Sequence, residues 1–134
     1  MNLENYDVII IGGGPAGISA SLWCHELGLN AILLESKPEL GGQLHRTFNP
    51  IENHLGVKAK NGKDLLDIFV EQIASRALNV RFNTKISAID LLNKSIETEN
   101  DERFSAKSLI IATGVKRRTL GLDCENRFLN KGII

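Results

Sequence analysis

The sequence is poor in several features that would point to particular classes of protein. Its only cysteines, Cys24 and Cys124, are too few for a disulfide framework or a four-cysteine zinc site. Its three histidines do not have metal-ligand spacing. Neither charge is in excess, because 16 Lys and Arg balance 16 Asp and Glu, whereas a binder of nucleic acids or anionic membranes would be basic. We therefore expect no metal site, no nucleic-acid partner and no membrane partner.

No targeting or membrane-spanning segment is visible in the sequence. The acidic N-terminus lacks the basic region and the long apolar run of a signal peptide. Purely apolar stretches such as Val8–Ile11 are far too short to cross a bilayer. We therefore expect a cytoplasmic protein.

What is present fits a globular domain. Hydrophobic residues make up 43% of the chain and charged residues 24%, proportions that a disordered chain would not have. A chain of 134 residues fits one domain and is long enough to bury a core of its own.

The first 35 residues show a strand–helix–strand pattern. Tyr6–Ile11 and Ala31–Leu34 are short and apolar, which is typical of strands buried on both faces of a parallel sheet. Between them, Ile18–Leu27 is apolar and small, and Gly28 is suited to end a helix. The pattern predicts one right-handed βαβ unit.

The remainder predicts a long loop, one helix and a group of strands. Residues 37–62 hold two prolines and four glycines, and so long a loop is usually functional or disordered. Lys63–Leu78 has apolar residues at helical spacing and predicts a helix that covers the sheet. A small β-meander is predicted over 80–82, 86–91, 95–98 and 103–105, and an apolar strand, Leu109–Ala112, follows it. The predicted fold class is α/β, a Rossmann-like parallel sheet with an inserted small antiparallel β-meander.

A glycine-rich turn, Gly-Gly-Gly-Pro-Ala-Gly, follows the first strand and matches G-x-G-x-x-G. In this context Gly12 permits the tight turn, Gly14 lets a pyrophosphate approach the backbone, and Gly17 lets helix and strand pack closely. Pro15 suits the first helical turn, where its missing N–H has no cost. The free N–H groups at Pro15–Ala16 and the positive end of the helix favour phosphate groups.

Glu35 ends the second strand, 18 residues after Gly17. A carboxylate there can accept hydrogen bonds from the ribose hydroxyls of an adenosine and would repel a 2′-phosphate, which favours FAD or NAD over NADP. A P-loop is excluded because no Gly-Lys-Ser/Thr follows the glycines. A methyltransferase also combines a glycine turn with a strand-terminal acid and stays open at this point.

Longer segments resemble a known family. Residues 35–44 are similar to the segment after the second strand in two-dinucleotide-domain flavoproteins of the pyridine nucleotide-disulfide oxidoreductase family. The resemblance is strongest to thioredoxin reductase and its relatives, including the ferredoxin–NADP reductases of that scaffold. Ile51-Glu52-Asn53 with Gly56 resembles the next family motif, and 109–114 with 118–122 resembles the strand and linker that close the first FAD segment. These motifs disfavour a methyltransferase and a simple NAD dehydrogenase.

The resemblance implies an FAD site with a role for each matching residue. No residue is expected to act as a nucleophile or general acid, because the flavin carries the chemistry. The resemblance implies contacts with the pyrophosphate (Gly12, Gly14, Pro15, Ala16 and Gly17), the adenosine ribose (Glu35), the isoalloxazine (Asn53) and the adenine (Ile86). It also implies that Gly42, Gln43 and Leu44 line the path from the pyrophosphate to the ribityl chain, and that the main chain of Ala112, Thr113 and Gly114 approaches the cofactor.

The sequence also departs from the family pattern. It has no second G-x-G-x-x-G/A for NADPH, no Cys-x-x-Cys and no returning Gly-Asp segment. We therefore expect residues 1–134 to be a single, incomplete FAD-binding domain, the N-terminal segment of an enzyme that passes electrons from NADPH through FAD to a disulfide or a one-electron acceptor. NADPH and a redox protein would be partners of the full-length enzyme. The alternative is a free-standing FAD- or NAD-binding module without a complete activity of its own. An exposed sheet edge would favour a homodimer.

Two polar features near the motifs have open interpretations. The basic run Lys116-Arg117-Arg118 could hold a phosphate at a domain junction or be a solvated linker. Among the histidines, His45 is of interest because it directly follows Gln43-Leu44 in the cofactor loop.

Overall fold

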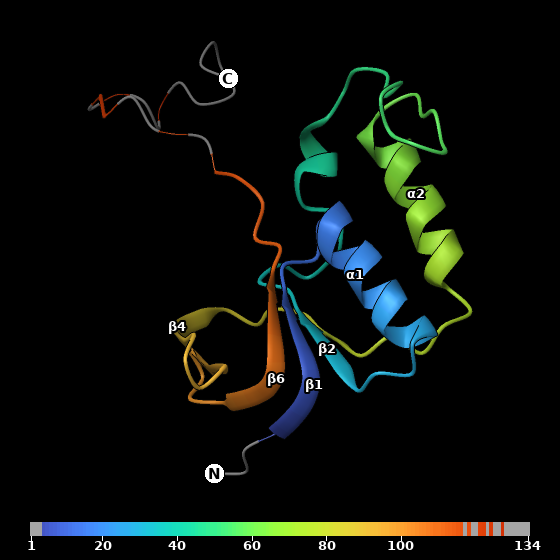
Figure 1. The fold of residues 1–134 in the computed structure, drawn as a ribbon. Coiled ribbons are helices and arrows are strands. Elements are labelled where there is room, and N and C mark those ends of the chain that lie inside the picture. The colour runs from blue at the N-terminus through green and yellow to red at the C-terminus, as the bar shows by residue number, and fades with distance from the viewer. Residues whose placement is uncertain (1–3, 117, 119–120, 123, 125–126, 128–134) are drawn as a thin grey trace.

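The computed structural model describes residues 4–116, 118, 121, 122, 124 and 127. In this part of the chain one six-stranded sheet has the strand order β3-β2-β1-β6-β5-β4, with helices on one side (Figure 1). The elements in chain order are β1 (Glu4–Ile11), α1 (Pro15–Glu26), β2 (Ala31–Leu34), the 3-10 helix η1 (Gly42–Arg46), α2 (Gly62–Ile73), β3 (Val80–Arg81), β4 (Ile86–Asp90), β5 (Ser95–Thr98) and β6 (Arg103–Ile111).

The sheet combines parallel and antiparallel pairing. β1 lies between β2 and β6 and is parallel to both, with Ile9 opposite Ile32 on one side and Leu109 on the other. β3 is parallel to β2, whereas β4, β5 and β6 form consecutive antiparallel pairs. The predicted α/β class, a Rossmann-like sheet with a small antiparallel meander, is confirmed.

Two details of the predicted strands are wrong. The segment 80–82 was expected in the meander, but Val80–Arg81 is the parallel edge strand beside β2, because the chain returns through α2 in the direction of β2. The segments 103–105 and 109–112 were expected as separate strands, but β6 runs unbroken from Arg103 to Ile111. No Gly, Pro, Asn or Asp interrupts residues 106–108, so nothing in the sequence ends the strand there.

Both faces of the central strands are buried. On one face Val8 and Ile10 pack with Leu33 and with Cys24 of α1. Among residues 4–116 no helix lies on the opposite face, and the meander covers it instead. Its core consists of Ile9, Ile11, Ile32, Leu34, Ile96 and Phe104. Adjacent residues in the second half of β1 therefore belong to different clusters, which explains why Val8–Ile11 is apolar throughout rather than alternating.

The helix α2 forms an outer layer, with α1 between it and the sheet (Figure 1). Its buried residues Leu65 and Leu66 pack with Ile18 of α1 and Leu44 of η1. The prediction that this helix covers the sheet directly is wrong, because α1 already occupies that place. The helix also ends at Ile73 rather than Leu78, where the N–H groups of residues 74 and 76 bond to carbonyls three residues earlier in tighter turns.

One ion-pair network joins the last residue of β3 to the amino-terminal ends of β1 and β6. The Arg81 guanidinium bonds to the Glu4 carboxylate at 2.7 and 3.0 Å and to Glu102 at 2.9 Å, and it lies 5.1 Å from the centre of the Phe104 ring. The hydrogen bond from the Tyr6 hydroxyl and the Arg81 guanidinium lower the pKa of the Glu4 carboxyl. Arg81 thereby ties β3 to β1 and β6.

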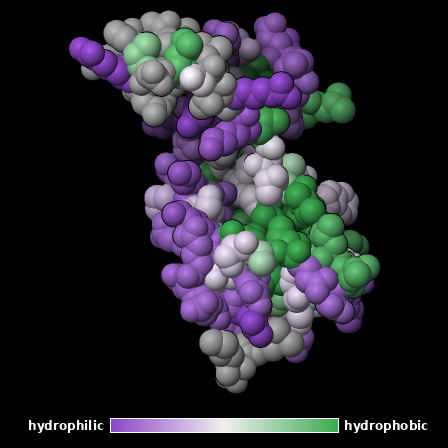
Figure 2. Space-filling view, turned by 90° about the vertical axis from the view of Figure 1, so that its left-hand side faces the viewer, coloured by the Kyte–Doolittle hydropathy of each residue, from purple (hydrophilic) through white to green (hydrophobic). Residues whose placement is uncertain are grey.

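The side of the molecule that carries β4 and β6 keeps an apolar patch on its surface (Figure 2). The exposed large apolar residues on β4, the following turn and β6 are Ile89, Leu91, Leu92, Ile110 and Ile111.

No helix of the described residues is long and apolar enough to span a bilayer.

The turn between β1 and α1 leaves no room for a side chain at two of its glycines, Gly12 and Gly17. A Cβ at Gly17 would lie 1.8 Å from the Gly12 carbonyl oxygen. Gly12 has φ +104°, and a Cβ there would lie 2.5 Å from the Ala112 carbonyl oxygen. Gly14, in contrast, has φ −76°, and the nearest atom to an added Cβ is 4.0 Å away.

We expect Gly17→Ala to destabilise the fold by about 2 kcal/mol or more, because α1 must move away from the turn to admit a methyl group. Gly14→Ala is the matched control, since the same methyl group fits at that position without backbone strain. Urea unfolding followed by circular dichroism measures both variants. Equal losses of stability would contradict the proposed cause.

The Arg81 network predicts a pH-dependent contribution to stability. We expect Arg81→Met to lower Tm by a few degrees at pH 7 and by less at pH 3. The pKa of Glu4 is lowered in the folded state, so its contribution is present above the unfolded pKa and is lost as the pH falls through the folded pKa. Arg103→Met, which removes an exposed pair with Glu97, should have a smaller effect at pH 7. An equal loss at both pH values would assign the effect of Arg81 to its packing on Phe104.

Candidate functional site

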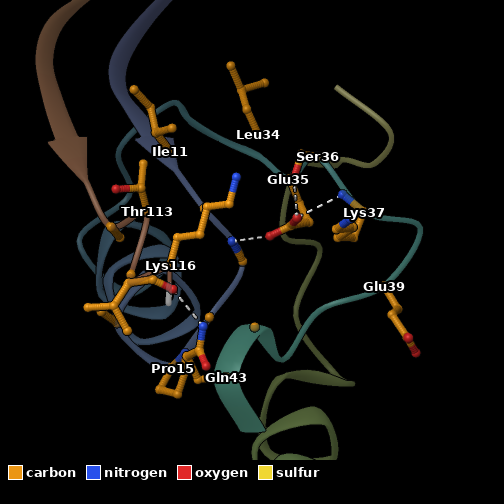
Figure 3. A pocket seen from close by; sticks show the side chains of 18 of the residues that line it. Ile11, Pro15, Leu34, Glu35, Ser36, Lys37, Glu39, Gln43, Thr113 and Lys116 are labelled. Atoms are coloured by element: carbon orange, nitrogen blue, oxygen red, sulfur yellow. Dashed lines mark hydrogen bonds between the residues drawn. The ribbon is translucent and has the colours of Figure 1, made fainter. Parts of the chain in front are cut away.

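A pocket of about 900 Å³ lies at the carboxyl ends of β1, β2 and β6 (Figure 3). Parallel strands of an α/β sheet present ligand sites at this edge, and the volume lies within the range of small-molecule and cofactor sites. Its walls are the glycine turn, the segment after β2, η1, the start of β4 and the segment after β6. In residue numbers these are 11–16, 34–39, 42–43, 45–46, 84, 86 and 111–116.

The N-terminus of α1 forms one wall of the pocket. Gly14 is the N-cap and has no side chain to bond the first N–H groups, and Pro15 at the first position has no N–H. The first intrahelical bond runs from the Ile18 N–H to the Gly14 carbonyl at 3.0 Å, so the N–H groups of residues 16 and 17 have no partner within the helix. No acidic residue lies in the first turn. This wall is therefore electropositive and suited to an anion.

Glu35 holds the glycine turn to the end of β2. Its side chain is buried, and its Oε2 accepts a hydrogen bond from the Gly13 N–H at 2.6 Å. Its Oε1 accepts from the Lys37 N–H at 2.8 Å and from the Ser36 hydroxyl at 3.1 Å (Figure 3). A carboxylate has roughly four lone-pair positions, so Oε2 keeps one for a hydroxyl group in the pocket.

The segment after β6 closes the pocket on another side. The Ala112 N–H donates to the Ile11 carbonyl at 2.8 Å, which continues the strand pairing past the end of β6. Three residues later, the Val115 carbonyl accepts a hydrogen bond from Nε2 of Gln43 at 2.8 Å (Figure 3). The side-chain amide of Gln43 therefore joins η1 to this segment across the pocket.

Eleven of the fourteen site residues predicted from the sequence line this pocket. Leu44 and Gly17 do not, because Leu44 is buried against α2 and Gly17 is buried against the turn. Asn53 is exposed in the loop before α2 and is not part of the pocket wall. The lining residues are Gly12, Gly14, Pro15, Ala16, Glu35, Gly42, Gln43, Ile86, Ala112, Thr113 and Gly114.

Several pocket residues were missed by reasoning from the sequence. Gly13 is the donor to Glu35, and a Cβ there would lie 2.7 Å from Leu40 and 2.9 Å from Glu35. Thr84 is buried beside Glu35, whose carbonyl accepts the Thr84 N–H at 2.9 Å. Nothing in the sequence around Thr84 indicates this position, because it depends on the pairing of β3 with β2. Lys116 had a signal, the basic run after β6, whereas Lys37 and Arg46 had none.

The described residues show no metal cluster or disulfide at the site. No group of three or more His, Cys, Asp or Glu side chains among them is arranged to hold a metal ion. Cys24 is buried in α1, where burial raises the pKa of its thiol, and Cys124 is exposed; both are free. His45 lines the pocket, and its Nε2 lies 2.8 Å from the Leu40 carbonyl oxygen.

Comparison with known proteins agrees with this arrangement. The sequence profile of the family "pyridine nucleotide-disulphide oxidoreductase" matches residues 6–133. The chain is 39% identical over 132 residues to a 34.2 kDa protein in the rubredoxin operon of Clostridium pasteurianum, covering 97% of this chain and 42% of that protein. It is 36% identical over 134 residues to thioredoxin reductase of Ureaplasma parvum, covering 99% of this chain and 42% of that protein.

Solved structures show the same relationship. Thioredoxin reductase from Lactococcus lactis superposes with a TM-score of 0.78 at 33% identity, covering 93% of this chain and 41% of that one. Thioredoxin reductase from Streptococcus pyogenes gives 0.74 at 32% identity, covering 95% and 41%. The chain thus spans less than half the length of these relatives. With a family profile that matches nearly all of its length, the chain belongs to the pyridine nucleotide-disulphide oxidoreductase family.

Proposed function

We propose that this chain binds FAD and forms the FAD-binding part of a flavin oxidoreductase. One observation carries the proposal: an electropositive helix N-terminus and a buried carboxylate line the same pocket. The hydrogen bond from the Gly13 N–H to Glu35 holds the two together. An adenine dinucleotide needs both, because it combines negatively charged phosphates with ribose hydroxyl groups. The donor set and the volume of the pocket fit this cofactor.

Each wall of the pocket has a distinct role in the proposal. The N-terminus of α1 would hold the pyrophosphate, because Gly14 presents no side chain there and leaves the backbone open. Glu35 would accept a hydrogen bond from the adenosine ribose with its free lone pair, and Ile86 of β4 would contact the adenine. The backbone of Ala112–Gly114 forms the remaining wall, and Leu44 and Gly17 act by packing rather than by contact.

The reaction belongs to the whole protein. Bound FAD would accept a hydride from NAD(P)H and pass electrons to a disulfide or a one-electron acceptor. The residues of this chain bind and orient the cofactor. NAD(P)H and a redox protein are partners of the full-length enzyme, of which we take residues 1–134 to be the N-terminal FAD-binding segment. The share of 42% that the chain covers in its relatives supports this assignment, and the exposed apolar side chains on β4 and β6 support a homodimer.

We expect the purified chain to retain FAD after desalting, with a visible absorption band shifted from that of free FAD. Gly14→Ala should weaken FAD binding on the order of tenfold, because its methyl group occupies the position of the pyrophosphate. The same variant should unfold at the wild-type urea concentration, which separates the loss of binding from a loss of fold.

The absence of FAD binding by the chain alone and by the full-length protein would overturn the proposal. Retention of FAD by the full-length protein but not by the chain alone would mean that later residues complete the site. Wild-type affinity for FAD in Gly14→Ala would contradict the placement of the pyrophosphate at α1.

Glu35 predicts discrimination against a 2′-phosphate. We expect the chain to bind AMP more tightly than 2′,5′-ADP, which is AMP with a phosphate added at the 2′ position, by about tenfold, because that phosphate would face the buried Glu35 carboxylate. Glu35→Gln should reduce this preference, as measured by isothermal titration calorimetry. The control is Glu39→Gln, which neutralises a more exposed carboxylate at the rim of the same pocket. An unchanged preference in Glu35→Gln would place the ribose elsewhere.

A further inference from the structure

Three cationic side chains line the pocket: Lys37, Arg46 and Lys116. None of the three makes an ion pair or a side-chain hydrogen bond with another described residue. The pyrophosphate of a dinucleotide carries two negative charges, whereas a helix N-terminus offers about half a positive charge. The pocket therefore has cationic side chains that no described carboxylate neutralises, and these can balance the charge of a bound pyrophosphate.

Lys116 is the best placed of the three. Its side chain extends into the pocket from the segment after β6, toward the side where Glu35 and Ser36 lie (Figure 3). Glu35 does not require this cation, because the Gly13 N–H, the Lys37 N–H and the Ser36 hydroxyl already engage its carboxylate. No carboxylate of the described residues lies within 4.0 Å of the Lys116 ammonium. The ammonium is available to a ligand.

The backbone that carries Lys116 is held in place. Gly114 has φ +69°, which turns the chain after β6, and the next residue accepts the hydrogen bond from Gln43 at 2.8 Å. Lys116 is thus one residue from a fixed point at the pocket wall. A lysine on a free linker would lose more conformational entropy on binding a phosphate than one positioned in this way.

We propose that Lys116 binds the pyrophosphate of the dinucleotide from the β6 side of the pocket, and that Gln43 is the positioning residue that holds this segment in reach. The proposal rests on the proposed function, since it assigns a second phosphate-binding element to the same site. The N-terminus of α1 and the Lys116 ammonium then approach the same anion from two different elements, and the first residue of the basic run acquires a role that its sequence left open.

The test compares nucleotides with and without phosphate. We expect Lys116→Met to weaken the binding of ADP and FAD by about tenfold and to leave adenosine binding unchanged, because adenosine lacks the pyrophosphate. The variant should also show a smaller dependence of ADP affinity on salt, since one screened charge–charge contact is gone. Lys116→Arg should keep most of the affinity. Gln43→Ala should weaken ADP and FAD by a smaller factor than Lys116→Met.

The matched control is Lys58→Met, which removes an exposed lysine outside the pocket and should not change any affinity. Thermal melts of each variant establish that it folds. A titration with NAD+ tests which dinucleotide the pocket prefers, because NAD+ has the same pyrophosphate as FAD. The proposed function requires FAD to bind more tightly than NAD+.

Two results would overturn the assignment and leave FAD binding in place. One is an unchanged ADP affinity in Lys116→Met, and the other is an equal loss for ADP and adenosine, which would mean that Lys116 acts on the nucleoside or on the fold. If the wild-type full chain bound neither FAD nor ADP, the proposed function and the role of Lys116 would both be overturned.

Discussion

The hydrogen bond from the Gly13 N–H to the Glu35 carboxylate is the contact on which the site depends. A buried carboxylate is costly unless hydrogen bonds compensate it, and here three donors from two segments do so. The bond fixes the glycine turn against the end of β2. Because the turn also begins α1, the same contact sets the direction of the helix axis relative to the strand. The position of the N-terminus of α1 thus follows from that of Glu35 at the end of β2.

The meander has a second part in forming the site. A Rossmann-like sheet normally has helices on both faces, but here the second face of β1 and β2 is covered by Ile96 and Phe104. This covering requires β4 and β5 to fold over the sheet, and it brings Ile86 at the start of β4 to the pocket wall. The hairpin therefore completes the core and supplies an apolar wall at the same time.

Local features of the sequence predicted the first βαβ unit well. Ala31–Leu34 was predicted with its observed bounds, and the strand, the helix and the glycine turn before it depend on short-range rules of periodicity, capping and sterics. The placement of Val80–Arg81 and the continuity of β6 depend on pairing with distant strands, which no local pattern encodes. The same division holds in the pocket. Eleven of the predicted residues lie on its wall, whereas Thr84 reaches it only through tertiary pairing, and Leu44 faces α2 because Gly62 allows α2 to approach its carbonyl oxygen.

The two ends of the pocket have opposite chemical preferences, and this asymmetry orients a ligand. Glu35 accepts hydrogen bonds and repels phosphate, so hydroxyl groups are favoured at the end of β2. The uncapped end of α1 attracts phosphate, and its free N–H groups cannot accept a hydrogen bond from a hydroxyl group. A mononucleoside would satisfy only the first end and inorganic phosphate only the second. A nucleoside diphosphate satisfies both in one orientation, which directs the remainder of a dinucleotide along Gly42 and Ala112–Gly114, where small residues leave the backbone accessible.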